Sequence, residues 1–109
     1  MELWFTEMHN DYALASIKVI KELCSKNSKY QRIDVLDTYE FGLVLVIDGY
    51  LMLTEKDEFI YHEMITHVPM AVNPFATDVL VIGGGDGGTL RELSRYETIK
   101  TIDIVEIDE

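Results

Sequence analysis

The chain has 109 residues, 48% of them hydrophobic and 27% charged, which allows one small packed domain, or one with part of a second, and argues against general disorder. Its 20 acidic and 9 basic residues give a formal charge of −11, which repels nucleic-acid phosphates and anionic membranes and attracts cations. We therefore expect no nucleic-acid and no membrane partner, whereas a cationic ligand is permitted.

Residues 1–55 consist of short β-rich segments separated by polar breaks. The predicted strands are 4–8, 14–23, 32–38, 41–47 and 50–53. Segment 14–23 can also be written as a helix through Ile17, Ile20 and Cys24, so both interpretations stay open there. Asp48-Gly49 between two β-rich runs is a strong hairpin signal. We expect residues 1–55 to form a small N-terminal antiparallel β-sheet domain.

The pattern changes to helical spacing at Asp57, and Pro69 lies near the end of that run, which predicts a linking helix over residues 56–72. Asn73-Pro74 then breaks the chain, and residues 73–109 read as strand 78–82, a glycine turn, a helix and strand 101–107. This order opens a doubly wound α/β sheet, so the expected fold class is α+β leading into α/β. One helix cannot cover both faces of a parallel pair, so we expect a piece of a larger protein.

The glycine run carries the sharpest chemical signal. Gly83, Gly85 and Gly88 satisfy G-x-G-x-x-G directly after a predicted strand and before a predicted helix. Glycines at these positions permit positive φ and a close approach of the backbone to a ligand. Glu106, 23 positions after Gly83, can accept hydrogen bonds from ribose hydroxyls, with Asp108 as the alternative. The pattern predicts a nucleoside site rather than a purely structural turn.

Asp86 lies inside this loop and indicates which nucleoside fits. Its carboxylate would repel a pyrophosphate at short range, whereas an ammonium or sulfonium group would be attracted. This favours S-adenosyl sulfonium chemistry over nicotinamide cofactors. Asp86 can also be the N-cap of the following helix, and the two roles are compatible.

Several motifs together resemble the spermidine synthase (polyamine aminopropyltransferase) family. Gly-Gly-Gly-Asp-Gly-Gly with Thr-Leu-Arg-Glu, residues 83–92, is similar to its nucleoside loop, and residues 55–64 are similar to its linking helix. Residues 46–49 are similar to its hairpin, residues 4–7 to its N-terminal opening and residues 30–31 to its third strand. The resemblance implies the start of a methyltransferase-like, Rossmann-type domain after the N-terminal sheet, which would act in oligomerisation or as a substrate lid.

The resemblance also implies an activity and site residues. The activity is transfer of an aminopropyl group from decarboxylated S-adenosylmethionine, a co-substrate rather than a cofactor, to putrescine, giving spermidine and methylthioadenosine. Gln31 would contact the nucleoside, Tyr61 and His62 the polyamine side, Asp86 the aminopropyl ammonium and Glu106 the ribose. The family's catalytic aspartate lies beyond Glu109, so we expect no catalytic residue in these 109 residues and an inactive fragment. A homodimer or homotetramer is expected.

Two other functions remain open: an S-adenosylmethionine-dependent small-molecule methyltransferase, and a non-catalytic oligomerisation module. No metal site is expected, because His62 and His67 are five positions apart and would be rotated by about 140° around a helix. We interpret His67 as a core or interface residue, and Arg91 and Glu92 as surface charges. A single cysteine and an N-terminus without signal-peptide character predict a cytoplasmic location.

Overall fold

A computed structural model describes residues 1–108; Glu109, the last residue of the predicted β-α-β unit, lies outside the described residues. Contacts divide the chain into two compact units, Met1–Asp57 and a second unit from Glu58 onwards. No helix among the described residues is both long and apolar enough to span a membrane.

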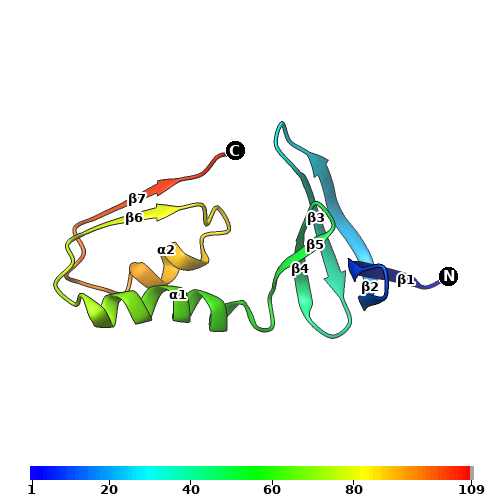
Figure 1. Cartoon of the computed structure of the whole chain (residues 1–109), viewed down its shortest axis with the longest axis horizontal. Helices are drawn as coiled ribbons and strands as arrows, with labels where there is room; N and C mark the ends of the chain where they lie inside the picture. Colours follow the sequence, from blue (N-terminus) through cyan, green and yellow to red (C-terminus); the bar gives the residue numbers. More distant parts are fainter. Residues whose placement is uncertain (109) are drawn as a thin grey trace. The chain divides into compact units, whose positions relative to one another are not determined.

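The first unit is a five-stranded antiparallel sheet (Figure 1). Its strands are β1 (Leu3–Asn10), β2 (Ala13–Asn27), β3 (Arg32–Thr38), β4 (Gly42–Ile47) and β5 (Tyr50–Thr54). They pair in sequence order, each with its chain neighbours, and shifts of register interrupt the β2–β3 pairing. The predicted antiparallel sheet is confirmed, and segment 14–23 is a strand rather than a helix.

The hairpin between β4 and β5 has the predicted turn. Asp48 and Gly49 both have positive φ, 51° and 83°, as a two-residue type I′ turn requires. The Asp48 carboxylate also accepts a hydrogen bond from the Arg32 backbone N–H at 2.8 Å, which ties the turn to the start of β3. The turn thus fixes the register of β4 and β5 and is linked to a third strand.

The core of the first unit lies on one face of the sheet. Val19, Leu36, Val44 and Val46 are buried, and Phe5 and Phe41 pack against them. Along β3 and β4 buried and partly buried residues alternate, because successive side chains of a strand point to opposite faces. The period-two pattern of the sequence therefore has a direct structural cause.

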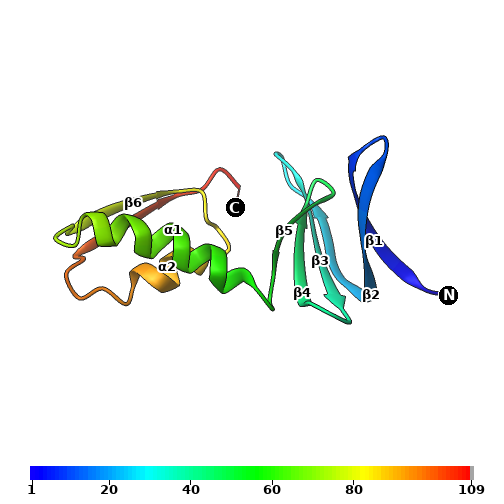
Figure 2. The same ribbon diagram turned by 60° about the horizontal axis from the view of Figure 1, so that its bottom comes forward.

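The second unit contains α1 (Glu58–Val72), β6 (Asp78–Ile82), α2 (Gly88–Leu93) and β7 (Thr101–Val105). Strands β6 and β7 pair in parallel, and both helices lie on one side of that pair (Figures 1 and 2). Helix α1 runs on past Pro69 to Val72, since proline removes one backbone hydrogen bond without always ending a helix. The Asn73 N–H bonds to the Pro69 carbonyl at 3.0 Å.

The opposite side of β6 and β7 is apolar and exposed. Leu80 is 60% exposed, Ile82 83% and Val105 59%, whereas Val79 and Val81 are partly buried. Helix α1 also exposes apolar side chains, among them Ile60, Met64 and Val68. The residues that it buries are His62, Thr66 and Met70. Two of the three side chains that α1 buries are therefore polar.

Candidate functional site

The glycine loop between β6 and α2 uses its glycines in two ways. Gly83, Gly84 and Gly87 have φ near +80°, a conformation that side chains disfavour. Gly85 and Gly88 have ordinary φ values but lie close to other side chains: a Cβ at Gly85 would crowd the Glu106 carboxylate at 3.1 Å, and one at Gly88 would overlap the His62 ring. The predicted close approach of the backbone is therefore made here to the chain's own side chains.

Asp86 lies at the tip of the loop, with its side chain 27% exposed. Its Oδ1 accepts a hydrogen bond from the Gly88 N–H at 2.8 Å and lies 3.0 Å from His62 Nε2. The N-cap of α2 is Gly87, so the suggested N-cap role of Asp86 is wrong in position, although its carboxylate does bind the first N–H of the helix. No hydrogen bond or ion pair involves Asp86 Oδ2 among residues 1–108.

His62 is the most deeply buried polar residue of the second unit, with a side chain 2% exposed. Its Nδ1 lies 2.5 Å from Glu58 Oε2, one helical turn earlier on α1. Tyr61 is exposed, and its ring meets the imidazole edge-on at a centroid distance of 5.2 Å. His62 therefore bridges two carboxylates, one from α1 and one from the glycine loop.

Glu106 directly follows β7, which ends at Val105 rather than at the predicted Ile107. Its Oε2 accepts a hydrogen bond from the Gly85 N–H at 3.1 Å, and its Oε1 accepts one from the Ile107 N–H at 2.8 Å. The side chain is exposed and lies against the glycine loop, while Asp108, the alternative, donates its N–H to the same carboxylate at 3.3 Å.

Charged groups of α1 and α2 continue from Glu58. Arg91 of α2 donates two hydrogen bonds to the Glu58 carboxylate, at 2.8 and 3.1 Å, and a third to Glu92 Oε1 at 3.1 Å. The Arg91 guanidinium, and then His62, hold the pKa of Glu58 below its usual range. The hydrogen bonds that Arg91 donates to Glu58 and Glu92 raise the pKa of its guanidinium, which therefore stays charged.

Glu92 is a second centre of the same network. It is buried and contacts Arg95 at 3.0 Å and His67 Nε2 at 2.9 Å, while His67 Nδ1 contacts the Tyr96 hydroxyl at 2.6 Å. Burial by itself would raise the pKa of Glu92, but hydrogen bonds from Arg95, Arg91 and His67 outweigh it and lower the pKa to about 2. The interpretation of Glu92 as a surface charge is therefore wrong.

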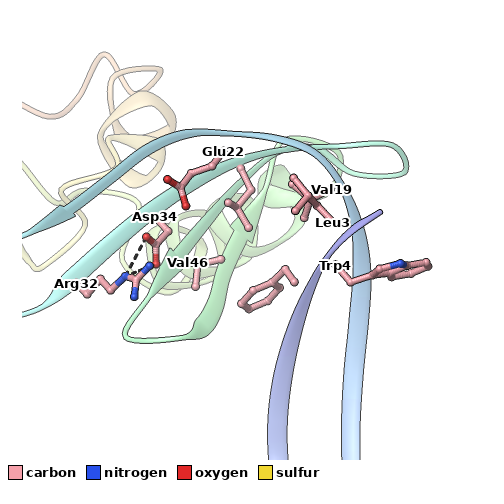
Figure 3. A pocket seen from close by; sticks show the side chains of 9 residues that line it. Leu3, Trp4, Val19, Glu22, Arg32, Asp34 and Val46 are labelled. Carbon is pink, nitrogen blue, oxygen red and sulfur yellow. Dashed lines mark hydrogen bonds and ion pairs between the residues drawn. The ribbon is translucent and has the colours of Figure 1, made fainter. Parts of the chain in front are cut away.

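Gln31 belongs to the first unit, directly before β3. Its backbone forms a turn with Ser28, where the Gln31 N–H donates to the Ser28 hydroxyl at 3.0 Å. A separate hollow of about 210 Å³ in this unit is lined by apolar side chains and by Glu22, Arg32 and Asp34 (Figure 3). Asp34 accepts hydrogen bonds from Ser25 at 2.5 Å and Arg32 at 3.1 Å. Gln31 does not line this hollow.

The structure thus brings three predicted residues together, Tyr61, His62 and Asp86, and sets Glu106 against the same loop. Sequence reasoning missed Glu58, which contacts His62, and Arg91, which in turn binds Glu58. The spacing of Glu58 and His62, one helical turn apart, was a signal that could have found the first. The arginine comes from another helix, and no local pattern points to it.

Sequence comparisons identify the family. A model described as the spermidine synthase tetramerisation domain matches residues 3–55, and one described as the spermine/spermidine synthase domain matches residues 58–109. The chain belongs to the spermidine synthase family. Among curated members it is similar to the polyamine aminopropyltransferase of Clostridium botulinum (strain Eklund 17B / Type B), with 63% identity over 109 residues, which are 100% of this chain and 38% of that protein.

Other spermidine synthase relatives give the same result. The polyamine aminopropyltransferase of Lachnoclostridium phytofermentans is 62% identical over 99% of this chain and 38% of its own length. The crystal structure of spermidine synthase from Thermotoga maritima matches 97% of this chain and 38% of that one, with 42% identity and a TM-score of 0.93. A spermidine synthase in complex with the transition-state analogue AdoDATO has the same identity and TM-score and covers 97% of this chain and 36% of its own. The chain spans about 38% of the length of the curated relatives named here.

Proposed function

We propose that the full-length protein containing this sequence is a spermidine synthase, which transfers the aminopropyl group of decarboxylated S-adenosylmethionine to putrescine. Family membership supports this activity, and so do the names of relatives that are 62–63% identical. Residues 73–109 would then begin a methyltransferase-like, Rossmann-type nucleoside domain, and the parallel pairing of β6 and β7 supports that interpretation. A cytoplasmic location stays a prediction.

The reaction joins two cations, and this determines what the protein must supply. The putrescine nitrogen attacks the aminopropyl carbon next to the sulfonium, a C–N bond forms, and the C–S bond breaks. The bonding electrons return to sulfur as methylthioadenosine leaves, and the new ammonium loses a proton to a base. A free amine of this kind has a pKa of about 10.4, so a carboxylate must orient it and accept its proton. Fixed negative charge at a desolvated site holds both cations together.

Asp86 is the observation that carries the proposal. A phosphate-binding loop would present its N–H groups and no carboxylate to its ligand. Here a carboxylate stands at the loop tip, engages its own helix through Oδ1, and has no partner for Oδ2 among the described residues. We propose that Oδ2 binds the aminopropyl ammonium, while Tyr61 and His62 line the polyamine side and Glu106 binds the ribose. The proposed nucleoside contact of Gln31 rests on the family resemblance.

Product analysis tests the proposal and separates it from a methyltransferase. The full-length protein is incubated with putrescine and either decarboxylated S-adenosylmethionine or S-adenosylmethionine, and the products are identified by mass spectrometry. We expect spermidine and methylthioadenosine from the decarboxylated donor only. Methylated putrescine with S-adenosylhomocysteine would contradict the proposal and establish the alternative.

The donor preference itself depends on Asp86. S-adenosylmethionine would bring its own carboxylate against the Asp86 carboxylate, whereas the decarboxylated donor presents only an ammonium. We expect Asp86→Asn to lower the affinity for the decarboxylated donor by about tenfold or more, which is the scale of one charge-assisted hydrogen bond. The ratio between the affinities for the two donors should become smaller. Isothermal titration with both nucleosides measures this, and an unchanged ratio of affinities would exclude the role.

A second function, oligomerisation by the first unit, is supported by the tetramerisation-domain match over residues 3–55. Strands β1 and β2 also expose large apolar side chains that a partner could cover: Leu3, Trp4, Met8, Leu14, Ile20 and Leu23. We propose a homodimer or homotetramer. Light scattering of the full-length protein should give the mass of two or four chains, and a monomer at micromolar concentration would contradict it.

A further inference from the structure

Four polar side chains in contact with one another lead from the surface of α2 to the glycine loop. They are, in order, Arg91, Glu58, His62 and Asp86. Arg91 is half exposed, Glu58 has a side chain 20% exposed, and His62 is closed off from solvent at 2%. The chain of contacts ends at the one carboxylate that stands at the tip of the loop.

The orientation of His62 is fixed from three sides. Glu58 holds Nδ1 at 2.5 Å, Asp86 lies 3.0 Å from Nε2, and the backbone of Gly88 fits against the ring where no Cβ has room. Both ring nitrogens therefore face carboxylate oxygens, so the ring cannot turn without losing its contact with Glu58 or its contact with Asp86. The contact with His62 engages Asp86 Oδ1 and leaves Oδ2 without a partner among residues 1–108.

Glu58 has its own restraint. Its side chain has three rotatable bonds and sits in the first turn of α1, so a single contact would not fix it. The two parallel N–H groups of Arg91 bind it in a planar fork, which determines the orientation of the carboxylate as well as its charge. The arginine is supplied by α2, the helix that begins at the glycine loop. The residue that orients Glu58 therefore lies on the helix into which the glycine loop leads.

We propose that Glu58 and Arg91 are positioning residues, which act through His62 to hold Asp86 in the geometry that binds the ammonium of the aminopropyl donor. This inference rests on the proposed function. Neither residue contacts the donor, so both act on its binding from a distance. A network that only joined α1 to α2 would affect stability and leave donor binding unchanged.

Steady-state kinetics of the full-length protein test the inference with Glu58→Gln, which keeps the size of the side chain and removes its charge. We expect the KM for decarboxylated S-adenosylmethionine to rise about tenfold, within the 10–100-fold range seen when the outer partner of a metal-binding histidine is lost. The kcat should change far less, because an ammonium contact is made equally in ground and transition states.

A double-mutant comparison shows whether Glu58 acts through Asp86. In an Asp86→Asn background, Glu58→Gln should raise the KM for the donor no further, since residues in one chain of contacts are not additive. An equal tenfold rise in both backgrounds would overturn the inference. So would an unchanged KM in the Glu58→Gln variant of a protein that makes spermidine. A wild-type protein that makes no spermidine would instead overturn the proposed function.

Two further variants guard against misfolding and non-specific charge effects. Arg91→Lys keeps the charge at a half-exposed position and loses the planar fork, so we expect a smaller rise in the KM for the donor, about threefold. If Glu58→Gln does not fold, an unchanged KM in Arg91→Lys overturns the inference. The matched control is Asp78→Asn, the same carboxylate-to-amide change at the other end of β6 from the loop, which should leave the KM for the donor unchanged.

Discussion

The two units of this chain bury different kinds of side chain. The first unit encloses a cluster of aliphatic residues, Val19, Leu36, Val44 and Val46, and most of its hydrogen bonds are sheet ladders between chain neighbours. Among residues 58–108, the second buries His62, Thr66 and Glu92 together with Met70 and Leu93 as its large apolar residues. The first unit buries three polar side chains as well, Asp34, Thr38 and Thr54, but it has the larger aliphatic cluster.

The charged residues between the two helices of the second unit need an explanation other than stability. A buried ionised group costs free energy unless it is paired, and apolar replacements of buried ion pairs are often at least as stable. The charged residues between α1 and α2 are therefore poor candidates for pure stabilisation, and they lead to the carboxylate of the glycine loop. The buried threonines of the first unit, by contrast, serve local turns: Thr38 binds the Gly42 carbonyl at 2.8 Å.

The largest effect should come from a charge placed in the apolar core of the first unit. Val44 is 1% exposed, and Val44→Asp should lower the free energy of unfolding by more than about 4 kcal/mol, because the new carboxylate has no partner there. Leu43→Asp, on the opposite face and 42% exposed, should cost less than about 1 kcal/mol. Hydrogen exchange by mass spectrometry measures both, and equal losses would show that the aliphatic cluster is not the core.

An intermediate effect is expected at Gly88, where the polar interior of the second unit meets the loop. Glycine-to-alanine changes in a helix normally stabilise by about 0.5–1 kcal/mol. Here the added methyl group would overlap the His62 ring, so Gly88→Ala should instead destabilise by about 1–3 kcal/mol. Thermal unfolding gives the sign directly, and a stabilised variant would mean that His62 is not held against the loop.

The smallest effect is expected from pH, because the arginines around Glu92 remain half or more exposed and water can replace the carboxylate. The pKa of Glu92 falls from 4.5 to about 2 in the folded chain. The contribution of Glu92 to the free energy of unfolding is therefore complete above pH 4.5 and is lost as the pH falls towards 2. Acid titration followed by circular dichroism should show a shallower loss of stability for Glu92→Gln than for the wild type, and a slope identical to wild type would contradict this.

Local rules predicted the strands well. Segment 32–38 was predicted with the bounds that β3 has, and Asp48-Gly49 forms the expected turn, because alternation and turn chemistry are encoded by neighbouring residues. The linking helix was predicted over residues 56–72 and spans Glu58–Val72, so its end agrees and its start lies two residues later, while β7 ends two residues before the predicted Ile107. Element ends depend on contacts that a local pattern does not contain.

The site was predictable in part for the same reason. The glycine pattern and the aspartate inside it are local signals, and they identified the loop. The role of Gly88 depends on His62, which lies far earlier in the sequence, on α1. The burial of Glu92 depends on partners that include His67, also on α1. These are tertiary contacts, so the sequence alone could not separate a buried network from surface charges.

The strand order of the first unit also has a consequence for synthesis on the ribosome. Each strand from β1 to β5 pairs only with its neighbours in the chain, so every ladder is complete as soon as the next strand has emerged. Parallel pairing of β6 with β7 has to wait, because Asp78 faces Thr101 and the glycine loop and α2 lie between them. At about 5–20 residues per second, the sheet has seconds to form before β7 is made. We therefore expect the first unit to fold during synthesis, before β6 pairs with β7.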